Sequence, residues 1–183
     1  MARARRSRPT AESRAALRET RGALTDPAAV MDAAARFLAA RPRSVDETRR
    51  RLVHLGYPSE LVERVLERLV EMDYLDDAAF ARAWVESRDR AHPRGESALR
   101  RELALKGVAR DMVDEVLAER VEGGGGTDPN RTAAEALLEG RRSAFAREPD
   151  LMRRRQKAYS LLARNGFDPE TCREAATSFA TEC

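Results

Sequence analysis

Apolar residues along this chain recur at intervals of three and four positions, which is the spacing of one face of an α-helix. The first block, residues 26–41, opens with an Asp-Pro pair suited to the N-cap and first position of a helix, and a proline follows it. A second block, 44–56, starts with a serine that can cap it and ends at a glycine, and a third covers 58–72. Three consecutive helices are therefore predicted.

The same pattern returns after residue 75, so the three-helix unit is a repeat. Gly107 in the second copy takes the place of Gly56 in the first, and each glycine is predicted to end the second helix of its unit with a left-handed backbone. The apolar residues around the two glycines match in pairs: Leu52 with Leu103, Tyr57 with Val108, Val62 with Val113, Val65 with Val116, and Leu66 with Leu117.

A weaker third copy follows the glycine run 123–126, with Gly166 at the equivalent position. Its last helix has a reduced inner face of Cys172, Ala175, Ala176 and Phe179, so this module is expected to be the least stable. The prediction is an all-α fold of three tandem three-helix modules in an elongated, curved arrangement. Its parts are a mobile basic tail at 1–27, module 1 at 28–75, module 2 at 76–121, a Gly-rich linker at 122–130 and module 3 at 131–183.

Charge is unevenly distributed, although the net charge is only +3. Residues 1–27 carry seven Arg against three acidic residues, whereas 28–120 carry 17 basic and 18 acidic residues and 121–183 carry ten of each. A near-neutral folded part argues against attachment to nucleic acid through phosphate contacts alone, and favours local basic faces together with a protein partner. The tail is either a solubilising extension or an arm that contacts phosphates.

Other function classes find little support in the sequence. No stretch approaches the 18 apolar residues of a membrane span, and the two cysteines, Cys172 and Cys183, have neither disulfide nor metal-ligand spacing, which fits a reducing cytoplasm. The glycine run lacks the Lys-Ser/Thr of a phosphate-binding loop, and no catalytic constellation is found. We therefore expect a cytoplasmic protein that is not an enzyme and needs no cofactor or metal.

Residues 75–88, Leu-Asp-Asp-Ala-Ala-Phe-Ala-Arg-Ala-Trp-Val-Glu-Ser-Arg, resemble the central signature of the RecX family, which usually has Tyr in place of Trp84. Residues 44–69 and 99–108 also resemble that family, so the resemblance is strong over 28–120 and rests on the repeat pattern over 130–180. It implies a regulator that binds the RecA recombinase filament on single-stranded DNA and mostly inhibits its ATPase and recombinase activity, in DNA repair and the SOS response. We expect this regulator to be a monomer. The alternative is a helical-repeat protein that acts directly on single- or double-stranded DNA.

Basic residues on the second helix of each module are the candidate binding residues. Arg50 points away from the predicted core face, and Arg100 and Arg101 take the places of Arg49 and Arg50 in the repeat. Stacked modules would bring such residues into one basic strip suited to phosphates or an acidic filament surface. Solvated faces with helix-stabilising charge pairs are the alternative. The candidates for contact with RecA or DNA are Arg49, Arg50, Arg51, Arg100, Arg101, Arg153, Arg154, Arg155 and Lys157.

Trp84 shares a helix face with Phe80, so burial in the core is expected rather than a role as a base-stacking platform. His54 and His92 stand apart from any metal-ligand pattern and are expected at the surface or at helix ends.

Overall fold

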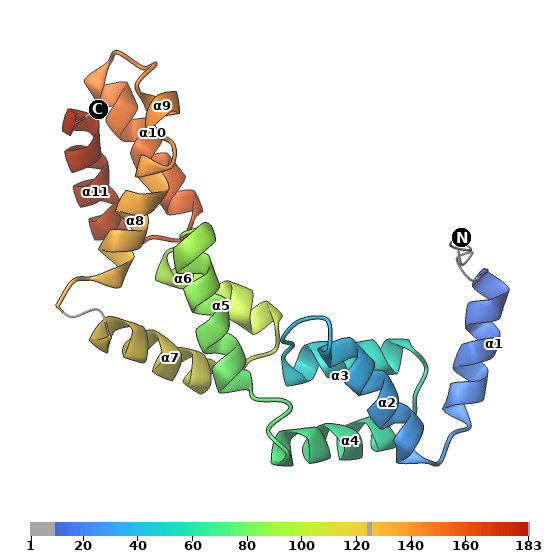
Figure 1. Cartoon of the computed structure of the whole chain (residues 1–183). Coiled ribbons are helices and arrows are strands. Elements are labelled where there is room, and N and C mark those ends of the chain that lie inside the picture. The colour runs from blue at the N-terminus through green and yellow to red at the C-terminus, as the bar shows by residue number, and fades with distance from the viewer. Residues whose placement is uncertain (1–9, 124–125, 183) are drawn as a thin grey trace, which may run out of the picture. The chain divides into compact units, whose positions relative to one another are not determined.

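The computed structural model describes residues 10–123 and 126–182 (Figure 1). All regular secondary structure in these ranges is helical, which confirms the predicted all-α fold of tandem three-helix modules. None of the described helices is both long enough and apolar enough to cross a membrane. The helices are α1 (Ala11–Gly22), α2 (Pro27–Leu38), α3 (Val45–His54), α4 (Ser59–Glu71), α5 (Asp77–Ala91), α6 (Glu96–Leu105), α7 (Arg110–Glu122), α8 (Pro129–Glu139), α9 (Arg142–Phe145), α10 (Leu151–Arg164) and α11 (Pro169–Glu182).

The chain divides into two compact units, Met1–Asp76 and Asp77–Cys183. In the first unit, α2 and α3 begin at the predicted caps, because the side chains of Asp26 and Ser44 accept hydrogen bonds from the backbone N–H groups of Ala28 and Glu47. Each large apolar side chain in the core contributes about 1.5–3 kcal/mol of burial free energy. The core residues are Val30, Ala33, Ala34, Leu52, Tyr57, Leu61, Val62, Val65, Leu66, Leu69 and Leu75.

Helix α1 differs from the predicted tail. Thr10 caps it, and its Arg21 donates a hydrogen bond of 3.1 Å to the carbonyl of Leu55 and lies 5.3 Å from the ring centre of Tyr57. Residues 1–27 lack the apolar face that would have predicted this helix. Instead, the side chain of Arg21 holds α1 against the turn after α3. Residues 1–9 of the predicted tail lie outside the described residues.

The second unit contains two further modules, and the first of them consists of α5, α6 and α7. Gly107 has φ +79° and Gly56 has φ +95°, so both glycines end their helices in the left-handed region, as predicted. The core residues of this module are Phe80, Ala81, Val85, Leu99, Leu103, Val108, Val113, Val116 and Leu117.

Helices α8 to α11 form the other module, in which Gly166 has φ +84°. The short helix α9 was not predicted, and it carries Phe145 against Phe179, with ring centres 5.4 Å apart in an edge-to-face arrangement. The expected inner face of α11 is buried. The core residues are Ala133, Ala134, Leu138, Phe145, Ala158, Leu161, Leu162, Phe167, Cys172, Ala175, Ala176 and Phe179.

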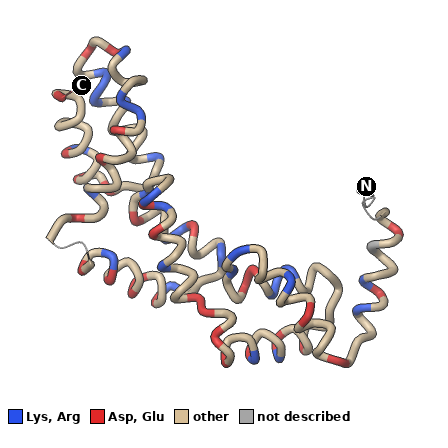
Figure 2. Tube along the Cα trace, viewed as in Figure 1, with Lys and Arg blue, Asp and Glu red and all other residues tan. Residues whose placement is uncertain are grey.

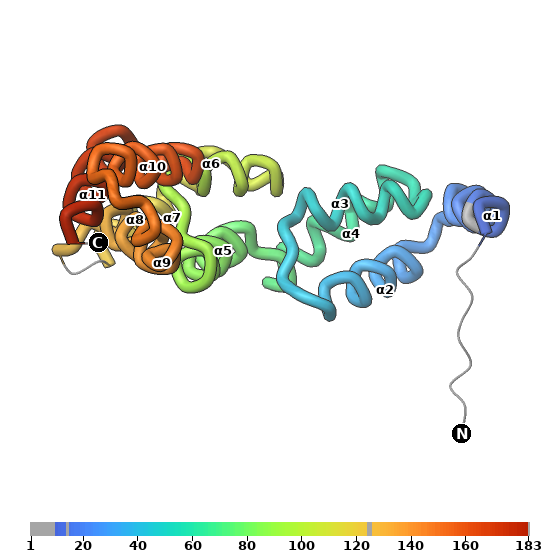
Figure 3. The backbone as a smooth tube through the Cα atoms, turned by 90° about the horizontal axis from the view of Figure 1, so that it is seen from above, coloured from blue at the N-terminus to red at the C-terminus, as the bar shows by residue number. Residues whose placement is uncertain are grey.

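These two modules are joined where the start of α6 meets the turn after α10 (Figure 3). The N–H of Gly95 donates to the carbonyl of Asn165 at 3.0 Å, and the N–H and hydroxyl of Ser97 donate to the carbonyl of Gly166 at 3.2 and 2.7 Å. A Cβ on Gly95 would lie 2.2 Å from the Gly166 oxygen, so the two backbones can approach this closely only without it.

Arg120 forms a second connection between the same modules. Its side chain is 9% exposed and donates to Asp89 on α5 and to Asn130 and the carbonyl of Pro129 at the start of α8. The arginine therefore connects the two sides of the predicted linker 122–130, in which residues 124 and 125 lie outside the described ranges.

Candidate basic surfaces

Basic positions recur along α3, α6 and α10, where Figure 2 draws them in blue. In module 1, Arg49 donates to both oxygens of Glu63 on α4 at 2.8 and 3.1 Å and also pairs with Asp46. The hydrogen bond between Arg49 and Glu63 is the main reason why the pKa of Arg49 is raised. The same hydrogen bond lowers the pKa of Glu63. The structure therefore uses Arg49 to connect two helices of its own module.

The neighbouring candidates on α3 are more exposed. Arg50 pairs with Asp46 one helical turn before it, at 2.5 Å, with its side chain 64% exposed. Arg51 is exposed and lies 5.9 Å from the ring centre of Phe37, whose ring also has Arg43 at 4.3 Å. Both candidates keep exposed surface for a partner, although each already has a contact within the module.

Module 2 repeats the ion pair of module 1. Arg100, in the place of Arg49, pairs with Asp114, which lies as far after Gly107 as Glu63 lies after Gly56. It also pairs with Glu96 at 2.7 Å. The recurrence of this arginine thus has an explanation within the modules, although exposed pairs of this kind contribute only about 0–1 kcal/mol.

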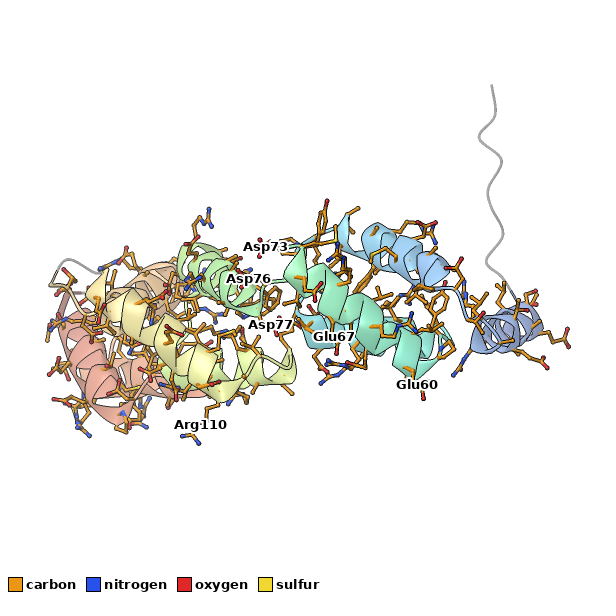
Figure 4. All side chains as sticks on the ribbon, turned by 90° about the horizontal axis from the view of Figure 1, so that it is seen from below. Glu60, Glu67, Asp73, Asp76, Asp77 and Arg110 are labelled. Carbon is orange, nitrogen blue, oxygen red and sulfur yellow. The ribbon has the colours of Figure 1, made fainter. Side chains whose placement is uncertain are left out.

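Arg101 differs from its neighbour, because its side chain is exposed and makes no hydrogen bond or ion pair with the described residues. It lines a surface hollow of about 490 Å³ together with Arg100 and Arg110, and Arg110 is 94% exposed (Figure 4). Of the two candidates on α6, Arg101 is the one available to a partner.

The candidates on α10 divide in the same way. Arg154 is half-buried and donates to the backbone carbonyls of Glu148 and Ala180, and Lys157 pairs with the Glu148 carboxylate. Arg153 and Arg155 are exposed, with no side-chain hydrogen bond or ion pair within the described residues.

Further cations surround α10 that the sequence prediction missed. Arg141 and Arg164 line a hollow with Lys157, and Arg173 on α11 lines another with Arg155. They were missed because the prediction considered only the basic residues of the second helices, whereas Arg141 and Arg173 lie outside α10 and are brought beside it by the fold.

Helix α4 does not extend this basic character. The exposed Glu60 and Glu67, labelled in Figure 4, alternate on it with Arg64 and Arg68, and Glu71 follows. A polyanion would meet carboxylates as often as guanidinium groups on this helix, so α4 is a poor phosphate-binding surface.

Trp84 is half-buried: it packs against the core of module 2, with its ring centre 5.9 Å from that of Phe80, so the expected burial is met in part. Its indole N–H donates to Glu102 at 2.9 Å, while Arg88 and Lys106 lie 4.4 and 5.0 Å from the ring centre. A hydrogen bond to a carboxylate at the module surface suits an indole better than a dry core. A base stacking on Trp84 would have to compete with these two cations for the ring.

Burial tends to raise the pKa of Glu102, but hydrogen bonds from Arg88 and Trp84 outweigh this effect and place the pKa below the ordinary value of 4.5. His54 and His92 are exposed, as expected. Within the described ranges, no group of three or more His, Cys, Asp or Glu residues is arranged to hold a metal ion.

Tandem three-helix modules with the same glycine turn after the second helix define a helical-repeat protein, and comparison with known proteins identifies the family. Models of the RecX family match residues 31–69 as its first three-helix domain and 76–117 as its second. The regulatory protein RecX of Prosthecochloris aestuarii is 34% identical over 145 residues, which cover 79% of this chain and 89% of that protein. The RecX of Mycobacterium avium is 36% identical over 151 residues, which cover 80% and 83%. The chain belongs to the RecX family of regulatory proteins.

Solved structures agree on the fold. The RecX crystal structure from Lactobacillus salivarius superposes with a TM-score of 0.71 at 15% identity, covering 85% of this chain and 97% of that one. A second RecX crystal structure gives a TM-score of 0.67 at 21% identity, covering 90% and 76%.

Proposed function

We propose that this protein binds the RecA recombinase filament on single-stranded DNA and modulates, mostly by inhibiting, the ATPase and recombinase activity of RecA. It does so in the cytoplasm as a monomer, without a cofactor and without catalysis of its own, in DNA repair and the SOS response. Membership of the RecX family, with its first and second three-helix domains matched, is the observation that carries the proposal.

The exposed arginines on the second helices supply the contacts. Arg50, Arg51 and Arg101 in modules 1 and 2, with Arg153 and Arg155 in module 3, are exposed and face phosphates or acidic filament surface. The remaining candidates, Arg49, Arg100, Arg154 and Lys157, keep the helices that carry these arginines in place through their intramodule contacts.

Direct action on DNA is the second candidate function, because unpaired cations are concentrated around α10. In this second function, the protein would inhibit recombination by competing with the recombinase for DNA, without contacting the recombinase.

The DNA-dependent ATPase of the cognate RecA, titrated with this protein at fixed salt, tests the proposal. The ATPase rate should fall to a plateau, and the protein should bind RecA filaments directly, because the target is the filament. Full restoration by excess DNA together with no detectable RecA binding would favour direct action on DNA. An unchanged rate at saturating protein, with no detectable RecA binding, would refute the first function.

A further inference from the structure

Two hollows lie on either side of α10 in module 3. The first, about 430 Å³, lies between α10 and the α9 segment, where Arg141, Lys157 and Arg164 surround the apolar edge of Phe145. The second, about 370 Å³, lies between α10 and α11, with Arg155 and Arg173 on its walls beside Tyr159. Gln156 lines both hollows, so they are adjacent and form one basic surface across the helix.

Comparison of the repeats shows that this basic surface replaces an ion pair. Tyr159 lies as far before Gly166 as Arg49 and Arg100 lie before their glycines, and Arg173 lies where the acidic partners Glu63 and Asp114 lie after theirs. Module 3 therefore has an aromatic ring and a guanidinium group where modules 1 and 2 have a neutralised pair.

The cations around these hollows are not neutralised by the module itself. Lys157 pairs with Glu148, but the side chains of Arg141, Arg155, Arg164 and Arg173 make no hydrogen bond or ion pair with the described residues. Four unpaired guanidinium groups across one helix attract an anion of extended shape, because each can donate two parallel hydrogen bonds to a phosphate or carboxylate.

Tyr159 narrows the choice of ligand. Its ring is half-buried against the module core and forms one wall of the second hollow. An aromatic wall beside guanidinium groups suits an unpaired base next to its phosphates, whereas the bases of a duplex are stacked within it and cannot enter. A carboxylate peptide would use the arginines but would have no need of the ring.

We propose that the two hollows around α10 bind single-stranded DNA, with Arg155, Arg173, Arg141 and Arg164 on successive phosphates and Tyr159 stacked on a base. The proposal deepens the proposed function, on which it rests for the choice of ligand. The experiments below use DNA without RecA. Failure of the DNA site would therefore leave the proposed RecA binding untouched, and failure of RecA binding would leave the DNA site untouched.

Fluorescence anisotropy of a labelled oligothymidylate, titrated with the full chain at several salt concentrations, measures the phosphate contacts. Each phosphate contact to a single strand contributes about 0.7 to the slope of log K against log salt, so the double variant R155A/R173A should lower this slope by about 1.4. Between roughly 50 and 200 mM salt, the parent should therefore lose about sevenfold more affinity than the variant.

The matched control is R36A/R64A, which removes two exposed, unpaired arginines from the first unit and leaves the net charge equal to that of the test variant. Its slope should equal that of the parent. A slope unchanged in R155A/R173A, equal losses in both variants, or no saturable binding by the parent at low salt would overturn the proposal.

An abasic oligonucleotide of the same length and charge tests the stacking contact. The parent should bind oligothymidylate about fivefold or more tightly than the abasic strand, since stacking contributes about 1–3 kcal/mol per base. Tyr159→Leu should lose this preference and Tyr159→Phe should keep it, with unchanged circular dichroism in both. Equal binding of the two strands by the parent would refute the assignment to single-stranded DNA.

Discussion

Substitution of Gly95 by Ala tests the connection between modules 2 and 3. The backbone of Gly95 has φ −73° and ψ 162°, a conformation that alanine adopts without strain, so any loss of stability comes from the space that the Cβ requires. That Cβ would lie 2.2 Å from the oxygen of Gly166, and the two backbones must therefore separate.

Separation breaks three hydrogen bonds, one from the N–H of Gly95 and two from Ser97. At about 0.5–1.5 kcal/mol for each bond, the free energy of unfolding should fall by about 1.5–4.5 kcal/mol. Urea unfolding followed by far-ultraviolet circular dichroism measures this loss, and the fluorescence of Trp84 reports on module 2 separately.

Gly140→Ala is the matched control, because it adds the same methyl group to the same unit. Gly140 has φ −59° and ψ −10°, and its added Cβ would meet no atom closer than 3.5 Å. Alanine at such a site should be neutral or should raise stability by about 0.4–1 kcal/mol. If Gly95→Ala unfolds at the same urea concentration as the parent, the contact at Gly166 does not hold the modules together.

Three further predictions concern charged groups. The double variant R50E/R101E should melt within about 0.5 kcal/mol of the parent yet bind RecA filaments or DNA more weakly at low salt, with the difference shrinking as salt rises; equal low-salt binding would make these arginines solvated surface only. Arg120→Met should lower the free energy of unfolding in urea by about 1–3 kcal/mol, a range kept low because Asp89 is partly exposed. Adding Asp89→Asn to that variant should lower it little further, because the ion pair is already lost. Because the pKa of Glu102 is lowered, its ionised carboxylate stabilises the folded state fully above pH 4.5, and this stabilisation is lost as pH falls through the folded-state pKa. The emission of the single tryptophan should change over the same pH range, and E102Q should abolish that pH dependence.

The sequence was sufficient for those parts of the fold that depend on local signals. Asp26 and Ser44 cap helices as predicted, and the three glycines that align the repeats all have positive φ. These features need only a residue and its near neighbours, so a pattern along the chain reveals them.

The features that were missed depend on contacts between distant residues. Helix α1 is held by Arg21 on the carbonyl of Leu55, a contact that the composition of residues 1–27 does not encode. The ion-pair partners of Arg49 and Arg100 lie on the following helix, and a signal for them was present: an acidic residue follows each glycine at the distance at which the arginine precedes it. Comparing charges as well as apolar residues between repeats would have identified it.

The turn at the end of the second helix leaves a small notch in the module surface, because glycine has no side chain there. At Gly56 this notch accepts Arg18 of α1, and at Gly166 it accepts Ala98 and the start of α6. Both close approaches occur at the same position of the repeated unit, at a glycine with positive φ, so one turn ends the helix and also admits the segment that precedes it in the chain. A side chain at Gly56 or Gly166 would therefore have two effects, straining the turn and pushing the preceding segment away.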